Sequence, residues 1–136
     1  MRFVPYLNFD GTTAEAMQFY KAVFGGTLTL MRFGDMPDAE PEMPHADRTM
    51  HATLALEGAV LMASDLPPGY EGQTTRGVNI SFDTSTRAEA ERIFSALSDG
   101  GNVMMPLSET FWSPCFGMVT DRFGISWMIA TGNMPT

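Results

Sequence analysis

The chain has 136 residues, a mass of 14.9 kDa and 44% hydrophobic residues, enough for one domain with its own core. Its net charge of -8 and its scattered basic residues argue against nucleic acid or an anionic membrane as a partner. The lone Cys115 cannot form an internal disulfide, and no apolar run approaches the ~18 residues of a membrane span, so we expect a cytoplasmic protein.

The first half of the chain predicts a strand, a helix and three further strands. Apolar residues at helical spacing over residues 12–24 end at a glycine pair, which indicates a helix and its end. Thr12 and Glu15 match a capping box, in which the hydroxyl and the carboxylate each bind a free backbone N–H at the helix start. A loop rich in proline and acidic residues follows over 34–47. Alternating apolar residues predict strands over 4–9, 27–33, 48–57 and 59–64.

The second half repeats this order after a linker over about residues 65–76. Thr-Thr-Ala-Glu-Ala at 12–16 returns as Thr-Arg-Ala-Glu-Ala at 86–90, and Thr86 and Glu89 form a second candidate capping box. A helix is expected over 86–98, and strands over 77–82, 102–107, 116–120 and 125–130. We therefore predict one α+β domain of two βαβββ modules, about residues 1–66 and 77–132. In each module the single helix covers one face of the sheet, which leaves the opposite face for another partner.

Short motifs spread over the chain resemble those of a known superfamily. They occupy residues 5–11 (PYLNFDG), 19–26 (FYKAVFGG), 50–52 (MHA), 61–65 (LMASD), 109–112 (ETFW) and 116–124 (FGMVTDRFG). The ordered set resembles the vicinal-oxygen-chelate superfamily of glyoxalase, bleomycin-resistance and extradiol-dioxygenase proteins, and within it the phosphonate-operon B-like (PhnB-like) proteins. The resemblance implies tandem βαβββ modules forming curved mixed sheets around a cavity, with the helices outside. It also implies a homodimer, whose interface would use the same patch of both subunits.

The resemblance also indicates where a metal would bind. Metal-dependent members hold one divalent ion through His, Gln or Glu side chains on the first and last strands of each module. The matching positions here are Val4, Met62, Gly77 (or Val78, if the register shifts by one) and Met128. None of these side chains is a ligand for a hard or borderline ion. The usual metal site is therefore predicted to be missing, with no cofactor bound.

Polar residues on the predicted helix-free faces are candidates for binding a small organic molecule above an apolar floor of Met62 and Met128. An alternative is that these groups simply pair with one another. His51 has three possible roles, which are internal hydrogen bonding, ligand contact or metal binding. Trp112, on a loop, either covers the cavity or packs at a subunit contact. The candidate ligand-binding residues are Tyr6, Asn8, His51, Thr53, Ser64, Asn79, Ser81 and Trp112.

Two functions of different classes fit the sequence. The first is binding of a small organic molecule in a cavity between the modules. The second is a metal-dependent isomerase, lyase or dioxygenase of the superfamily with shifted ligands. Metal-free acid–base chemistry at His51 lacks a second catalytic partner, and Cys115 has no basic neighbour in sequence to activate it. Methyltransferase activity is not expected, because no Gly-rich turn between a strand and a helix, followed by an acid, marks a site for a nucleotide-like methyl donor.

Overall fold

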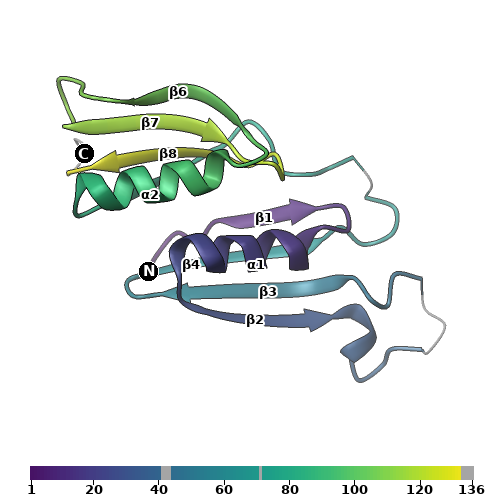
Figure 1. Ribbon diagram of the computed structural model, residues 1–136. Helices are drawn as coiled ribbons and strands as arrows, with labels where there is room; N and C mark the ends of the chain where they lie inside the picture. Colours follow the sequence, from purple (N-terminus) through teal and green to yellow (C-terminus); the bar gives the residue numbers. More distant parts are fainter. Residues whose placement is uncertain (41–43, 71, 133–136) are drawn as a thin grey trace. The chain divides into compact units, whose positions relative to one another are not determined.

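The computed structural model describes residues 1–40, 44–70 and 72–132 and divides into two compact units, Met1–Thr75 and Arg76–Thr136 (Figure 1). The division falls at the end of the predicted linker, which is hydrogen-bonded to the first unit near both of its ends. The N–H of Leu66 donates to the carbonyl of Phe9 at 2.8 Å, and the N–H of Thr75 donates to the carbonyl of Asn8 at 3.0 Å.

The first unit has the order β1 (Tyr6–Phe9), α1 (Thr13–Phe24), β2 (Thr27–Arg32), β3 (Thr49–Leu56) and β4 (Ala59–Asp65), with a short 3-10 turn at Phe33–Asp35. Its strands form one sheet in the order β1-β4-β3-β2. β1 runs parallel to β4, and the other neighbours are antiparallel. The predicted order of elements is confirmed, although the first strand begins at Tyr6 instead of Val4.

The second unit repeats this arrangement with β5 (Asn79–Thr84), α2 (Arg87–Ser98), β6 (Asn102–Ser108), β7 (Cys115–Thr120) and β8 (Ser126–Thr131). Its sheet has the equivalent order β5-β8-β7-β6, again with one parallel pair, β5 and β8. Two mixed sheets, each with one helix, confirm the α+β class and the paired βαβββ modules.

Each helix lies on one face of its own sheet (Figure 1), and that face forms the core of the unit. In the first unit, Met17 and Tyr20 of α1 and Leu54 and Ala63 of the sheet are fully buried. Along β4, buried residues alternate with half-buried ones, so Met62 lies on the face away from α1, as the sequence predicts. The alternation separates the helix-covered face from a helix-free face that remains accessible.

The predicted capping box of the first helix is wrong, because the Thr12 side chain makes no capping hydrogen bond. Asp65, at the end of β4, takes its place with a side chain that is 2% exposed. Its Oδ1 accepts from the N–H of Gly11 at 2.9 Å and from the N–H and hydroxyl of Thr13 at 3.0 and 2.8 Å. Its Oδ2 accepts from the N–H of Thr49 at 2.9 Å. A carboxylate from a distant strand therefore compensates the positive end of the α1 dipole.

The second helix is capped locally, and the Thr86 half of its predicted capping box is confirmed. The hydroxyl of Thr86 accepts from the N–H of Glu89 at 3.2 Å. The turn before β8 is held by another buried carboxylate, Asp121, which accepts from the N–H groups of Phe123 and Ile125 and from Nε1 of Trp127. These contacts make Asp121 a turn residue and hold Trp127, which is 2% exposed, in the core.

No helix in the described part of the chain is both long and apolar enough to cross a membrane. Both α1 and α2 have 12 residues, whereas a spanning helix needs about 20.

Candidate functional site

The helix-free face of the first sheet carries five of the residues predicted to bind a ligand. Across β1 and β4, Tyr6 lies beside Met62 and Asn8 lies beside Ser64. Across β4 and β3, Met62 lies beside Thr53. All of these side chains are half-buried or exposed, whereas their neighbours Leu7, Leu61, Ala63, Ala52 and Leu54 on the α1 side are buried.

His51 lies at the centre of this face, between two hydroxyl groups. Its Nδ1 is 2.9 Å from the hydroxyl oxygen of Tyr6, and its Nε2 is 3.0 Å from Oγ1 of Thr53. The rings of Tyr6 and His51 are 5.7 Å apart, with 31° between their planes. Strand β4 lies between β1 and β3, so the Tyr6 side chain reaches over a whole strand to meet the imidazole. We call these three residues, Tyr6, His51 and Thr53, the His51 cluster.

The hydrogen-bond inventory of the His51 cluster determines what it offers a ligand. A neutral imidazole donates from one nitrogen and accepts at the other. One of the two hydroxyls therefore accepts from the ring and has its own hydrogen left for another partner. The other hydroxyl donates to the ring and keeps its lone pairs. The cluster thus presents one donor and one acceptor, and a change of tautomer exchanges them between Tyr6 and Thr53.

Two methionines adjoin the polar cluster. Met31 of β2 pairs with His51 and is 45% exposed, while Met62 separates Tyr6 from Thr53. An apolar surface with a few convergent polar groups is typical of small-molecule sites. Met31 was not among the predicted residues. The alternating pattern of β2 indicates which face of the sheet each of its residues occupies. It does not indicate which strand lies next to β2 or which residue lies opposite Met31.

The other predicted ligand-binding residues belong to the second unit. On β5, Asn79 pairs with Ser126 and Ser81 pairs with Met128, on the face opposite α2. Trp112 lies between β6 and β7 and makes edge contacts with Phe111 and Phe116, at ring distances of 4.6 and 5.5 Å. These contacts show packing inside its own unit, while the cavity-covering role remains a prediction.

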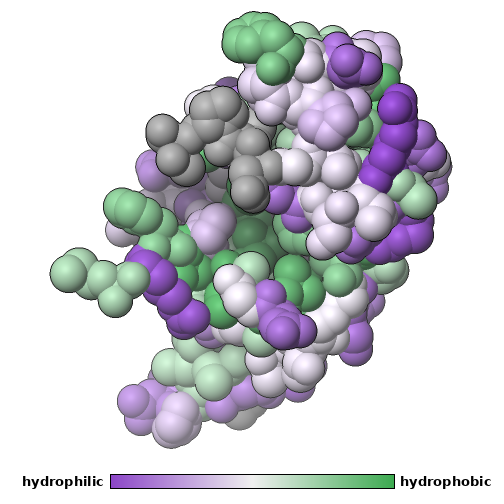
Figure 2. Space-filling model, turned by 90° about the vertical axis from the view of Figure 1, so that its left-hand side faces the viewer, coloured by the Kyte–Doolittle hydropathy of each residue, from purple (hydrophilic) through white to green (hydrophobic). Residues whose placement is uncertain are grey.

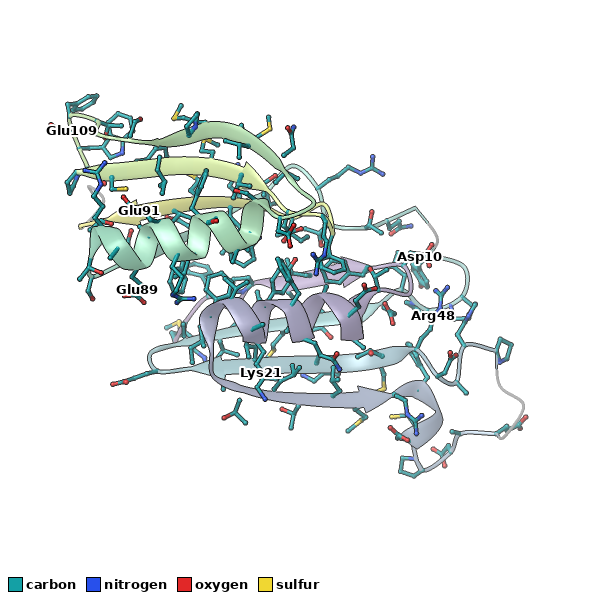
Figure 3. All side chains as sticks on the ribbon, in the orientation of Figure 1. Asp10, Lys21, Arg48, Glu89, Glu91 and Glu109 are labelled. Carbon is teal, nitrogen blue, oxygen red and sulfur yellow. The ribbon has the colours of Figure 1, made fainter. Side chains whose placement is uncertain are left out.

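Two ion pairs of the first unit lie outside the His51 cluster. Arg48 and Asp10, labelled in Figure 3, are 2.7 Å apart. Arg32 and Asp35 are 3.1 Å apart at exposed positions, where such pairs add little stability. The hydrogen bond from Arg32 lowers the pKa of Asp35 below its usual value, and the same contact raises the pKa of Arg32. Figure 2 shows hydrophilic residues in several separate places on one face, interspersed with apolar ones.

The residues at the metal positions of the superfamily do not fit a divalent ion. Val4 and Met62 in the first unit, and Gly77 and Met128 in the second, have no side-chain nitrogen or oxygen to donate. The described residues also contain no group of three or more His, Cys, Asp or Glu placed to hold an ion. Both nitrogens of His51 already face hydroxyls. No chemistry of a divalent metal is therefore assigned to these positions, and the absence of a cofactor stays a prediction.

Paired βαβββ units with one helix on each mixed sheet define the class of glyoxalase and bleomycin-resistance proteins. A glyoxalase/bleomycin resistance protein/dioxygenase family enzyme from Burkholderia phytofirmans PsJN has this fold, with a TM-score of 0.63 at 15% identity over 94% of this chain and 95% of that one. Within the class, the sequence model described as 3-demethylubiquinone-9 3-methyltransferase matches residues 1–130. The chain belongs to this PhnB-like family.

Individual relatives agree with this assignment. YjdN of Escherichia coli K12 is 33% identical over 135 residues, which cover 92% of this chain and 91% of YjdN. The crystal structure of PA1353 from Pseudomonas aeruginosa has a TM-score of 0.88 at 45% identity, covering 96% of this chain and 97% of that one. A putative 3-demethylubiquinone-9 3-methyltransferase, the PhnB protein of Bacillus cereus, has a TM-score of 0.76 at 25% identity, covering 97% and 100%. The resemblance to PhnB-like proteins is thereby confirmed.

Proposed function

We propose that this chain binds a small organic molecule at the His51 cluster, on the helix-free face of its first sheet. The observation that carries the proposal is the imidazole held between the Tyr6 and Thr53 hydroxyls at 2.9 and 3.0 Å on an accessible face. The ligand carries one acceptor and one donor for these hydroxyls, and an apolar part for Met31 and Met62. Binding needs no divalent metal, and the protein acts in the cytoplasm.

The methyl transfer named in the family description is not part of this proposal. In nucleotide-binding folds, the free N–H groups at a helix start face the anionic part of the cofactor. Here the N–H groups of Gly11 and Thr13 donate to the buried carboxylate of Asp65 instead. The hydroxyl of Thr86 caps the start of α2. Both helix starts are thus satisfied by side chains of the protein itself.

A thermal-shift screen of small amphipathic carbonyl, hydroxyl and amide compounds is expected to yield ligands that raise Tm with concentration. A ligand at 100 times its Kd stabilises the native state by about 2.7 kcal/mol. His51→Gln and Tyr6→Phe are each expected to weaken binding by about tenfold or more, or about 1.4 kcal/mol, because each removes a partner of the polar network. His45→Gln is the matched control, since His45 is the other histidine and lies exposed on a loop.

Nitrogen-15 NMR of the imidazoles provides a direct readout, because the chain has only two histidines. A ligand of the cluster is expected to shift the ring nitrogens of His51 and leave those of His45 unchanged. Equal affinity in wild type, His51→Gln and Tyr6→Phe would refute the proposal. Stoichiometric Ni, Zn, Fe or Mn in protein purified without chelator, lost on His51→Ala, would instead support a metal-dependent isomerase, lyase or dioxygenase with shifted ligands.

We also propose that the chain forms a homodimer, as its resemblance to the superfamily implies. Light scattering coupled to size-exclusion chromatography is expected to give a mass of twice the 14.9 kDa of one chain. The mass should stay at this value on dilution if the interface resembles that of an obligate dimer. A mass of one chain at all concentrations would rule the dimer out.

A further inference from the structure

The helix-free face of the second sheet carries three methionines in one row. The register of β7 and β8 pairs Met118 with Met128, and the register of β6 and β7 pairs Met105 with Met118. Met118 and Met128 are half-buried, and Met105 is 41% exposed. Three adjacent strands thus each contribute one thioether to the same face. We call these three residues, Met105, Met118 and Met128, the thioether row.

The thioether row lies outside the core of its unit. The other face of the sheet is packed against α2 and filled by Val119, Trp127 and Ile129, which are at most 2% exposed. Next to the row on its own face, the hydroxyls of Thr120 and Ser126 hydrogen-bond to each other at 3.1 Å. The methionines therefore adjoin polar side chains on an accessible surface and do not fill the space under the helix.

The spacing of the row suits a soft metal ion. Side chains paired across antiparallel strands have Cβ atoms about 4.5–5.5 Å apart. Two sulfurs bound linearly to one ion, with bonds of roughly 2.3 Å, lie roughly 4.6 Å apart. The rotatable bonds of methionine let both sulfurs adopt that separation. Thioethers select Cu(I) and are poor ligands for hard divalent ions, so this site differs in donor chemistry from the divalent site of the superfamily.

We propose that the thioether row binds one soft monovalent cation, Cu(I), with Met118 and Met128 as the principal ligands and Met105 as a third. The net charge of -8 favours a cation at the protein surface. Met118 is the central residue, because it pairs with both other methionines. Without it, the backbones of the two remaining methionines are separated by a whole strand, about 9.5 Å, so both side chains must extend over β7 to reach one ion and binding is weaker.

The test titrates the full chain with Ag(I) in chloride-free buffer by calorimetry. A parallel titration with Cu(I), under argon with ascorbate, uses competition against bicinchoninate. One ion per chain is expected. Met118→Leu is expected to weaken binding by more than about tenfold, Met128→Leu by a similar factor and Met105→Leu by less. Leucine replaces methionine at nearly constant volume, so the fold should be kept, and circular dichroism checks this.

Two control variants separate the row from other sulfur ligands. Met36→Leu removes an exposed methionine of the first unit that belongs to neither proposed site, and Cys115→Ser removes the buried thiol. Both are expected to bind like wild type, and X-ray absorption of the Cu(I) form should show sulfur neighbours at about 2.3 Å. Absent binding, binding unchanged by Met118→Leu, or binding lost in Cys115→Ser would overturn the proposal. These outcomes leave the His51 cluster untouched, since its residues belong to the other unit.

Discussion

Replacement of Asp65 by alanine is expected to lower the free energy of unfolding by about 3–5 kcal/mol. The carboxylate is 2% exposed and accepts four hydrogen bonds, from Gly11, from Thr49 and twice from Thr13. Its removal leaves the start of α1 and the first N–H of β3 without partners in a buried place. Urea unfolding followed by circular dichroism measures the change.

Asp65→Asn gives a graded version of this experiment. The amide has nearly the same shape, and its oxygen can take the three bonds of Oδ1. Its NH2 group then faces the N–H of Thr49, where two donors meet. A loss of roughly 2–3 kcal/mol is therefore expected, because one bond is lost and the remaining ones no longer end on a charge. Asp83→Ala, at an exposed position of β5, is the control and should change stability by less than about 0.5 kcal/mol. Equal effects at Asp65 and Asp83 would contradict this account of the cap.

The misassigned cap shows which part of the fold the sequence could predict. Capping boxes are local patterns, and the pattern at Thr86 and Glu89 correctly gives the cap of α2. The same local pattern at Thr12 fails, because Asp65 is 52 residues away from Thr13 in sequence and reaches the helix only through the pairing of β4 with β1. Hydrophobic periodicity predicts the order of the helices and strands and the face that each residue occupies. A contact between residues on strands far apart in sequence depends on which strands pair, and periodicity does not give that pairing.

The same limit applies to the candidate site. Alternation along β3 places His51 and Thr53 on one face, and their hydrogen bond connects residues two apart. The bond from His51 to Tyr6 crosses β4 and connects residues 45 apart, so only the strand order reveals it. In the second unit, the register of β6 shifts between Val103 and Met105. Such an irregularity changes which residue faces which side, so Met105 could not be assigned to the thioether row from its position in the sequence.

Alanine substitution at the glycines that follow the two helices is the other change expected to have a large effect. A Cβ on Gly26 would lie 2.5 Å from the carbonyl oxygen of Ala55 and 2.6 Å from Cδ2 of Leu56, at a φ of +90°. Gly26→Ala therefore combines backbone strain of about 1–2 kcal/mol with overpacking of about 1–3 kcal/mol. We expect a total loss of about 3–5 kcal/mol in urea unfolding.

Two other glycines separate these contributions. Gly58 has a φ of +77°, and no atom lies within 4 Å of the place that a Cβ would occupy, so Gly58→Ala should cost only the strain, about 1–2 kcal/mol. Gly101 has no positive φ, but a Cβ there would collide with the carbonyl oxygen of Thr120 and lie 3.0 Å from Cα of Asp121. Gly101→Ala should cost about 1–3 kcal/mol from overpacking alone.

The repeat explains why the close backbone approaches at Gly26 and Gly101 both fall just after a helix. Gly26 and Gly101 each precede the strand that returns from the helix to the sheet edge, β2 and β6. At this point the backbone passes against the neighbouring strand, β3 in the first unit and β7 in the second, with no room for a side chain. If Gly26→Ala costs no more than Gly58→Ala, this close approach does not limit the sequence, and Gly26 is needed only for its backbone conformation.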